Sequence, residues 1–435
     1  MELLRRALKA ILPKKLFTTL QPYYHLSLAY VGSLKYHHPS RKIMVIGVTG
    51  TKGKSSTTEI LGHILRTHGH KVATLSTIQF SIDGKTERNL FKMTMPGRFF
   101  VQKFLRDAVN AGCTHAVIEM TSEGARQHRH RFIDLDALLF TNLTPEHIES
   151  HGSFEKYKQA KLLLAKAVAD SPKRPRYIVA NIDDEHGTDF LAFQVEQTIP
   201  YSLKDLSLYT LHKDSVSFVF ENTTMRVPLV GLFNIYNCLA AITFARSIGV
   251  SLETIQNALH DLPPLKGRVE LFKSPALANK QFTAVVDYAH TPDSLTKLYE
   301  AFADKPKVCV LGNTGGGRDT WKRPEMGAIA ERFCDEIILT NEDPYDEDPE
   351  KIITDMKKGM SDTAPLTVIM DRREAIKTAF EKAVENSCVL ISGKGTDPYI
   401  MGPNGTKTPW SDAQVVQELL ADLADSKTTA ESSLP

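Results

Sequence analysis

Residues 49 to 56 read Thr-Gly-Thr-Lys-Gly-Lys-Ser-Ser, which is the composition of a phosphate-binding loop. Glycines let backbone N–H groups approach phosphate oxygens, a lysine reaches the outer phosphates, and the next hydroxyl is a ligand for Mg²⁺. The segment departs from the general pattern because Val48, five residues before Gly53, stands where a glycine is usual. The predicted phosphate contacts are Gly50, Thr51, Lys52, Gly53, Lys54, Ser55 and Ser56.

Three further residues have side chains suited to metal or phosphoryl chemistry: Glu119, His147 and Lys161. Glu119 ends an apolar run, and ligands gather at the carboxyl ends of strands in open α/β sheets. Taken singly, each residue also has an ordinary interpretation. A strand-end glutamate is usually solvated, a lone histidine is more often structural, and Lys161 shares its helix with Lys156 and Lys158.

The elements around the loop alternate between strands and helices. The phosphate loop follows a β-branched run, Ile43 to Val48, and opens a helix-like stretch near Lys54. Such alternation argues for a mostly parallel sheet with helices on both faces. Further strands are predicted at Lys71 to Ile78, Thr114 to Met120, Leu135 to Thr141 and Tyr177 to Asn181.

A proline pair and a glycine between Leu262 and Arg268 indicate a linker after the apolar helix Asn234 to Ile248. The alternation then starts again over about 170 residues, the size of a doubly wound domain. Its strands are predicted near Phe282 to Asp287, Val308 to Gly312, Glu336 to Thr340 and Cys388 to Ser392.

The predicted fold class is therefore α/β. A central, mostly parallel sheet domain of the P-loop type is followed by a C-terminal Rossmann-like doubly wound domain. The predicted boundaries are 1–40 for an N-terminal helical segment, 41–264 for the central domain, 265–425 for the C-terminal domain and 426–435 for a disordered tail.

Composition limits the partners. Lysine and arginine number 53 against 51 acidic residues, so no global field favours nucleic acid and anion binding must be local. The five cysteines are widely spaced without a CxxC pair, and three lie in apolar runs where a buried free thiol packs well, which fits a reducing cytosol. No apolar stretch reaches the roughly 18 residues of a membrane span, and no signal peptide is evident. We expect a cytoplasmic protein.

The segment from Leu3 to Tyr36 is basic, aromatic and amphipathic. Two interpretations are open: a helix docked on the main body, which is favoured, or a helix that makes weak contact with a membrane surface.

The form Thr-Gly-Thr-x-Gly-Lys-Ser resembles the loop of Mur ligases and folylpolyglutamate synthases, and the resemblance extends from about residue 41 to 420. It implies that Glu119 and His147 bind Mg²⁺ together with Ser55, and that Lys161 is carbamylated. Carbamylation turns an ammonium into a carboxylate-like anion that can bind a divalent cation. The stretch from Thr141 to Lys161 matches the family in order and spacing, so the resemblance favours Lys54, Glu119, His147 and Lys161 as catalytic residues.

The resemblance also implies an ATP site completed by two domains. Asn234 and Asn237 match the adenine-side segment, while Arg268, Asp287 and His290 match the segment that closes over the nucleotide. In the family, ATP phosphorylates a carboxylate and an amine attacks the resulting acyl phosphate. Mg²⁺ and Lys54 neutralise charge on the migrating phosphoryl group.

Within the family, residues 315–327 and 392–397 resemble the MurE-type ligases, which add the third residue of the peptidoglycan stem peptide. Arg318 is expected to grip the incoming amino acid's carboxylate. Diaminopimelate-adding members carry Asp-Asn-Pro-Arg where this chain has Glu342, Asp343, Pro344 and Tyr345. The expected pocket also includes Gly393 and Asp397. Without that arginine, no cation pairs with a second carboxylate, so we expect a basic amino acid, such as lysine or ornithine, to be added.

The expected acceptor is a UDP-muramyl peptide, held by Thr94, Met95, Thr121, Ser122, Gln127 and Arg129. Met95 replaces a usual threonine and Glu123 a usual histidine. Because only residues 1–40 precede the loop region, we expect the family's uridine-binding domain to be absent or reduced. A non-UDP or lipid-linked acceptor is therefore an alternative.

Two rival functions remain open at this stage. A folylpolyglutamate synthase shares the loop and the modified lysine, and a non-catalytic binding subunit would keep the fold. The Arg318, Asp287 and Gly-Lys-Gly segments argue against the first rival, and the retained Lys54, Glu119, His147 and Lys161 against the second. We expect a monomer.

Overall fold

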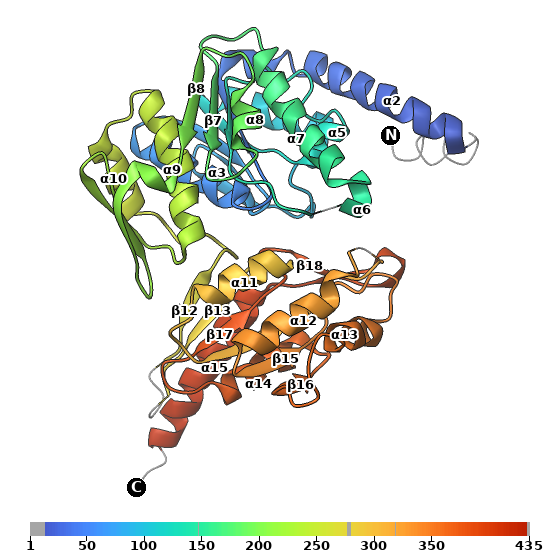
Figure 1. The fold of residues 1–435 in the computed structure, drawn as a ribbon, viewed down its shortest axis with the longest axis vertical. Coiled ribbons are helices and arrows are strands. Elements are labelled where there is room, and N and C mark those ends of the chain that lie inside the picture. The colour runs from blue at the N-terminus through green and yellow to red at the C-terminus, as the bar shows by residue number, and fades with distance from the viewer. Residues whose placement is uncertain (1–13, 147, 276–279, 318, 433–435) are drawn as a thin grey trace. The chain divides into compact units, whose positions relative to one another are not determined.

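The computed structural model describes residues 14–146, 148–275, 280–317 and 319–432. His147 and Arg318, two predicted site residues, lie outside this part of the chain. Contacts divide the chain into two compact units (Figure 1). Unit 1 comprises Met1–Ser207 and Tyr236–Leu259, and unit 2 comprises Leu208–Ile235 and His260–Pro435.

Unit 1 is built on an eight-stranded sheet of order β4-β3-β2-β5-β1-β6-β7-β8. The strands from β2 to β8 in this order are parallel, whereas β3 and β4 are antiparallel to their neighbours. Their bounds are β1 Met44–Thr49, β2 Val72–Leu75, β3 Gln79–Ile82, β4 Lys85–Arg88, β5 His115–Glu119, β6 Ala137–Phe140, β7 Tyr177–Asn181 and β8 Gln197–Tyr201.

Helices cover both faces of this sheet. α3 packs on β1, β2 and β5, and α9 reaches the same sheet where Phe244 meets Tyr177 edge-on. The other face carries α4 and α7. The helix bounds are α2 Lys14–Lys35, α3 Lys54–Thr67, α4 Arg98–Asn110, α5 Ser122–Arg126, α6 Ile148–His151, α7 Phe154–Ala169, α8 Gly187–Leu191, α9 Leu232–Ser247 and α10 Leu252–His260, with short 3₁₀ turns at η1 Pro39–Lys42 and η2 Leu203–Asp205.

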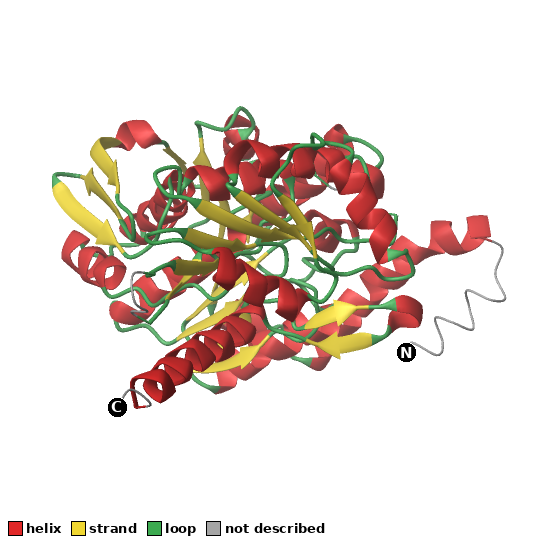
Figure 2. Cartoon of the chain, turned by 90° about the horizontal axis from the view of Figure 1, so that it is seen from below, coloured by secondary structure: helices red, strands yellow, loops and turns green. Residues whose placement is uncertain are grey.

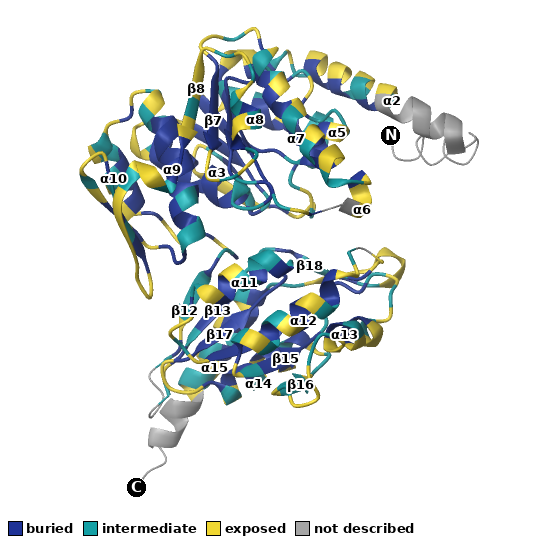
Figure 3. Cartoon of the chain, viewed as in Figure 1, coloured by how far each residue is buried: buried dark blue, intermediate teal, exposed yellow. Residues whose placement is uncertain are grey.

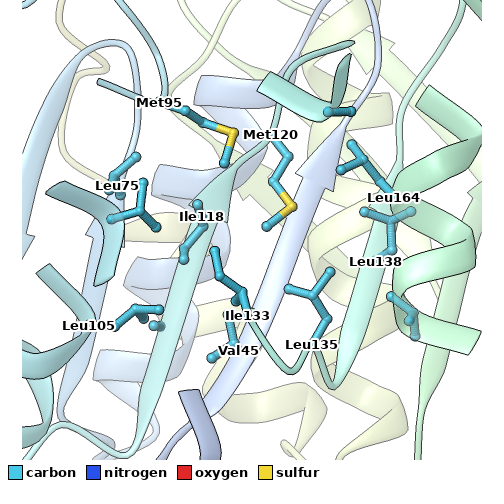
Figure 4. Close-up of a cluster of buried hydrophobic side chains, with 14 of the residues drawn as sticks. Val45, Leu75, Met95, Leu105, Ile118, Met120, Ile133, Leu135, Leu138 and Leu164 are labelled. Carbon is cyan, nitrogen blue, oxygen red and sulfur yellow. The ribbon is translucent and has the colours of Figure 1, made fainter. Parts of the chain in front are cut away.

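The core of unit 1 follows from strand alternation. Ile118 of β5 and Leu138 of β6 lie in one cluster with Met95, Leu105 and Leu164, the last two from α4 and α7 (Figure 4). Successive strand side chains point to opposite faces, so a fully buried strand needs apolar residues at every position. This is why β6 is continuously apolar and β5 is apolar between its two end residues, His115 and Glu119.

Unit 2 contains a six-stranded sheet of order β12-β13-β17-β14-β15-β16, which is parallel except for β12. A three-stranded antiparallel sheet, β11-β10-β9, and a two-stranded one, β18-β19, complete it. The bounds are β9 Leu206–Leu211, β10 Val216–Phe220, β11 Thr223–Val227, β12 Glu270–Lys273, β13 Thr283–Val286, β14 Lys307–Leu311, β15 Glu336–Leu339, β16 Leu366–Val368, β17 Cys388–Ile391, β18 Tyr399–Met401 and β19 Lys407–Pro409.

Alternate residues of the six-stranded sheet face two separate helical layers. Cys309 and Leu311 of β14 lie in a cluster with α11, α12 and α13, whereas Val308 and Val310 lie with α14 and α15. Figure 2 distinguishes the strands from the helices, and Figure 3 shows the labelled strands β13, β15 and β17 in the colour of buried residues. The helices are α11 Pro292–Glu300, α12 Lys322–Phe333, α13 Pro349–Lys357, α14 Arg372–Lys382 and α15 Asp412–Ser432, with η3 at Pro403–Gly405. The predicted α/β fold class is confirmed.

One expectation about the cysteines is wrong. Cys309 and Cys334 form a disulfide between β14 and the end of α12, whereas widely spaced cysteines predicted free thiols. The sheet alternation explains the pairing, because it points Cys309 toward the helical layer that contains Cys334. Cys113, Cys238 and Cys388 are buried free thiols, as expected.

No helix in the described part of the chain is both long and apolar enough to cross a bilayer.

Candidate active site

The phosphate loop lies between the end of β1 and the start of α3, as the sequence predicts. Gly53 is the N-cap of α3 with φ 82°, and Gly50 has φ 150°. A Cβ on Gly50 would collide with the Thr141 hydroxyl, and one on Gly53 would collide with Oδ1 of Asn237. Both positions therefore require glycine, and the helix N-terminus that follows them favours bound phosphate.

Lys54 and Lys161 meet at the carbonyl of Gly50. The Nζ of Lys161 donates to Gly50 O at 2.6 Å, and the Nζ of Lys54 donates to Gly50 O at 3.1 Å and Thr51 O at 2.8 Å. Lys161 is only 2% exposed. Burial, followed by repulsion from Lys54, lowers the pKa of Lys161 well below its usual value, which favours a neutral amine.

Glu119 links the loop to β2. Its Oε2 accepts hydrogen bonds from the Ser55 hydroxyl at 2.8 Å and from the backbone N–H of Thr77 at 2.8 Å. The Thr77 hydroxyl donates to the same carboxylate at 3.1 Å and lies 2.7 Å from the Thr94 hydroxyl. A continuous polar chain thus joins a predicted metal ligand to a predicted acceptor-binding residue. Sequence reasoning missed Thr77, although its place just after a strand that neighbours β5 was a usable signal.

The oxygen atoms of Ser55 and Glu119 are of the kinds that Mg²⁺ prefers, and such an ion usually completes its shell with phosphate and water. They therefore fit the expected ion. Among the described residues, which exclude His147, no group of three or more His, Cys, Asp or Glu side chains could hold a metal by itself.

Two more side chains border the loop. Lys52 forms an ion pair with Glu146 at 3.0 Å, and the hydroxyls of Thr51 and Tyr157 lie 3.0 Å apart. Glu146 and Tyr157 were not predicted as site residues, although both fall in the stretch from Thr141 to Lys161. Asn237 of α9 completes the surroundings, while Asn234, one turn earlier, donates to Val230 O at 2.8 Å.

The predicted acceptor residues gather around α5. Thr121 is the N-cap of α5, and Arg129 donates to the carbonyl of Met95 and to Oε1 of Gln127. The Ser122 hydroxyl lies 3.2 Å from Nε2 of His151, a residue that sequence reasoning did not select. The Met95 side chain is fully buried in the core, so only its backbone takes part in this group.

In unit 2 the predicted residues collect at the carboxyl ends of the parallel strands. Asp287 follows β13 and accepts hydrogen bonds from the N–H groups of Val269 and Ala289. The Arg268 guanidinium lies 4.4 Å from the centroid of the Tyr288 ring, which also contacts His290. The negative charge of Asp397 and then burial raise the pKa of Tyr288 well above its usual value.

Asp343 has a structural partner. The buried Lys394 ammonium lies 2.9 Å from Asp343 Oδ1 and 3.5 Å from Asp397 Oδ2, and Met401 N–H also donates to Asp343. Asp343 and Asp397 by themselves would make the pocket acidic, but Lys394 offsets this charge. Asp343 and Lys394 therefore form a buried ion pair beside the ends of the strands, which the residue types alone did not indicate.

Glu342 differs from Asp343. It is 3% exposed, its Oε1 accepts from the Thr314 hydroxyl at 2.9 Å, and its Oε2 has no hydrogen-bond partner among the described residues. Burial and the neighbouring Asp343 raise its pKa. Gly393, with φ 105°, leaves the space that this carboxylate occupies. The following Pro344 and Tyr345 lie against the backbone of Gly315 and Gly316, the loop that leads to Arg318.

The protein has a P-loop-like sheet unit and a doubly wound unit, and each carries polar residues at the ends of its strands. Such an arrangement is typical of a two-domain, nucleotide-dependent enzyme. Comparison of the sequence with protein families makes this specific. Residues 48–245 match the Mur ligase middle domain, and residues 267–395 match the Mur ligase glutamate ligase domain. The chain belongs to the Mur ligase family and is an ATP-dependent ligase.

Relatives of known name support this membership. The UDP-N-acetylmuramoyl-L-alanyl-D-glutamate–2,6-diaminopimelate ligase of Caldanaerobacter subterraneus subsp. tengcongensis is 33% identical over 413 residues, covering 91% of this chain and 82% of the relative. The ligase of the same name from Bacillus cereus is 34% identical over 387 residues, covering 86% and 77%.

Solved structures agree at the level of the fold. A solved structure of a protein with the same name, UDP-N-acetylmuramoyl-L-alanyl-D-glutamate–2,6-diaminopimelate ligase, is 28% identical to this chain with a TM-score of 0.59. The match covers 88% of this chain and 79% of the other chain. Mycobacterium tuberculosis folylpolyglutamate synthase is 15% identical with a TM-score of 0.68, covering 86% and 93%. The second likeness concerns the fold alone.

Proposed function

We propose that this protein joins a free amino acid to the carboxylate of a UDP-N-acetylmuramyl peptide, as the third residue of the peptidoglycan stem, in the cytoplasm. The observation that carries the proposal is the Ser55–Glu119–Thr77–Thr94 chain beside the phosphate loop, in a sequence that aligns with most of the length of the named MurE-type relatives.

The reaction follows from the chemistry of its substrates. A carboxylate and an ammonium form a salt and not an amide, so the acid must first be activated. The acceptor's carboxylate oxygen attacks the terminal phosphorus of ATP, giving an acyl phosphate and ADP. The deprotonated amine of the amino acid then attacks the acyl carbon and releases inorganic phosphate.

The loop residues stabilise charge in this reaction. In the structure, the Lys54 ammonium donates to the carbonyls of Gly50 and Thr51. We propose that it leaves these carbonyls and binds the terminal phosphates of ATP, because the carbonyls and the phosphates compete for the same ammonium. Bound Mg²⁺ would screen the phosphate oxygens. Ser55 and Glu119 would supply oxygen ligands, and the resemblance to Mur ligases implies His147 as a ligand of a second Mg²⁺. Asn234, Asn237, Arg268, Asp287 and His290 are proposed to hold the rest of the nucleotide.

Lys161 is proposed to act as a carbamate. A neutral amine attacks CO₂ at carbon and loses one proton, which leaves an anion at the end of the side chain. Burial and the neighbouring Lys54 lower the pKa of Lys161, which favours the neutral amine that this step requires. The anion would replace a repulsive ammonium beside Lys54 with an attractive partner, and would serve as a ligand for Mg²⁺.

The incoming amino acid is proposed to be basic, although the relatives named above are diaminopimelate ligases. Arg318 would bind its α-carboxylate, and the pocket would include Glu342, Asp343, Pro344, Tyr345, Gly393 and Asp397. By the resemblance to Mur ligases, Tyr345 stands where diaminopimelate-adding members have an arginine, so the cation for a second carboxylate would be missing. The buried Glu342 places a carboxyl group with a raised pKa at the same strand end, and a bound cationic side chain would favour its ionised form.

An incorporation assay tests this specificity. Product masses are measured after incubation with ATP, Mg²⁺, UDP-muramyl dipeptide and equal amounts of lysine, ornithine and diaminopimelate. We expect lysine or ornithine in the product, and Tyr345→Arg should increase the share of diaminopimelate about tenfold or more. Tyr209→Arg, an exposed tyrosine in β9, is the matched control. A clear preference of the unaltered protein for diaminopimelate would overturn the hypothesis.

Folylpolyglutamate synthesis is the alternative that the same fold permits. Ligands that bind only the native state raise the melting temperature, so a pteroylglutamate and a UDP-muramyl dipeptide can be compared directly. We expect stabilisation by the muramyl compound alone.

A further inference from the structure

Helix α2 uses one side to pack on α4. His25, Ala29, Gly32 and Ser33 are buried on that side, and Gly32 lies against Phe99 of α4. Arg106 of α4 donates to the carbonyl of Tyr36 at 2.9 Å, which fixes the end of the helix. The described inner side of α2 is therefore docked on the main body, in agreement with the favoured interpretation of this segment.

The opposite side of α2 carries large apolar residues in the open. Tyr23 is 69% exposed, Tyr30 48%, Val31 49% and Leu34 45%. Their spacing of seven, one and three residues places them on one side of a helix, and exposed positions follow α2 in Figure 3. We call these four residues the α2 outer face. A contiguous exposed apolar stripe of this kind marks an interaction surface.

The sequence that contains α2 is basic. Although the whole chain is nearly balanced, no aspartate or glutamate occurs from residue 3 to residue 58. Lys14, Lys15 and Lys35 belong to α2, and Arg5, Arg6 and Lys9 precede it in the sequence.

A second basic segment lies beside the same face. The ring of Tyr30 is 5.2 Å from that of Phe132, so the segment Arg126-Gln-His-Arg-His-Arg131 ends next to α2. Arg131 is exposed there. Arg131 thus adds a positive charge beside the α2 outer face, while Asp134, three residues further on, is paired with Arg41.

We propose that the α2 outer face docks on an anionic lipid bilayer, with its tyrosines at the level of the headgroups and the flanking basic residues on the lipid phosphates. Amphipathic helices that combine aromatic residues with lysine and arginine bind such surfaces by apolar burial and electrostatic attraction together. A second copy of this chain is a poorer occupant, because two such basic faces repel each other. The inference goes beyond the ligase reaction and does not depend on it.

Docking in this way has a consequence for the acceptor. The segment that ends at Arg131 also contains Gln127 and Arg129, two predicted acceptor-binding residues. Membrane binding would therefore hold the acceptor side of unit 1 near the lipid surface.

Vesicle flotation of the full chain tests the proposal. We expect the protein to float with vesicles that contain phosphatidylglycerol, to remain behind with pure phosphatidylcholine, and to be released by added salt. Tyr23→Glu/Leu34→Glu should weaken binding about tenfold or more. Ser27→Glu, which adds a charge to the exposed side of α2 and removes no apolar residue, should weaken it as well.

The control is Leu208→Glu/Leu211→Glu, which makes the same change at exposed leucines of β9 and should bind like the unaltered protein. Equal flotation of all variants, or no preference for phosphatidylglycerol, would overturn the proposal. A dimer in light scattering that the Tyr23→Glu/Leu34→Glu variant abolishes would assign the face to a second copy instead. Turnover of a soluble muramyl peptide should be unchanged in every variant, which separates this test from that of the ligase activity.

Discussion

Lys161 shows how burial changes the protonation, and therefore the reactivity, of a lysine side chain. The helix α7 buries it beside the phosphate loop, where a second ammonium, Lys54, lies at the same carbonyl. Both effects disfavour the charged form, so the protein is expected to carry an amine that is ready to be modified. Without modification, this residue costs the native state stability whenever it must be protonated.

A pH series measures that cost. The folded pKa of Lys161 lies below the unfolded value of about 10.4, so the unfolded chain binds the proton more readily as pH falls through this interval. In CO₂-free buffer, the stability of Lys161→Met relative to the unaltered protein should therefore be greatest near neutral pH and should decrease as pH rises toward about 10. The measurement is denaturant unfolding at several pH values.

Lys166→Met serves as the control, because Lys166 lies on the same helix with a side chain that is 60% exposed. The account fails if both variants show the same trend with pH.

Thr77 is the residue that the structure adds to the site. It donates to Glu119 through both its N–H and its hydroxyl, and its hydroxyl also reaches Thr94. Loss of such a supporting hydrogen bond typically reduces metal affinity or activity 10- to 100-fold. We expect Thr77→Val to lower kcat by about tenfold and to weaken the response to Mg²⁺, as steady-state assays over a range of Mg²⁺ would show. Thr86→Val in the exposed strand β4 should have no effect.

The site residues were predictable where they follow a strand in a motif, and not where they depend on packing. Glu119 and the loop could be placed because each directly follows an apolar run. The pairing of Lys394 with Asp343 could not, because the two residues are 51 positions apart and meet only when β15 and β17 lie in one sheet.

At the scale of elements, the junction of β1, α3 and α9 determines the phosphate site. Gly53 both adopts a left-handed conformation and leaves space for Asn237 of α9. The loop shape therefore depends on a helix almost two hundred residues away in sequence.

Two glycine substitutions separate these effects. Gly53→Ala and Gly84→Ala both place a side chain at φ 82°, and each should cost about 1 kcal/mol of stability. Only Gly53→Ala also displaces Asn237, since nothing lies within 4 Å of a Cβ at Gly84. We expect Gly53→Ala to weaken ATP binding strongly and Gly84→Ala to leave it unchanged, as measured by calorimetry. Equal nucleotide affinity in the two variants would refute this role for the junction.

The buried parallel strands were predictable because burial makes them largely apolar, and β7 was placed to the residue. The parallel strands β8 and β16 were missed, as were β4, β9 and β19, because these strands are partly or largely exposed and carry no such signal. The disulfide was missed for a related reason: spacing in sequence does not reveal which sheet face a cysteine occupies.

At the scale of the whole molecule, the two units divide the chemistry. Unit 1 presents the loop, Glu119 and Lys161, and unit 2 presents Arg268, His290 and the strand-end residues around Glu342. The proposed reaction requires both sets, because the phosphoryl group and the amine must reach the same carboxylate. This division explains why neither half of the sequence alone predicts an amide-forming enzyme.

The most direct test follows one oxygen atom. If the acceptor's carboxylate is labelled with ¹⁸O, an acyl phosphate places one labelled oxygen in the inorganic phosphate when the amine attacks. We predict phosphate that carries a single ¹⁸O in amounts equal to the amide formed, and loss of both in Lys161→Ala. Unlabelled phosphate alongside the amide product would contradict the account.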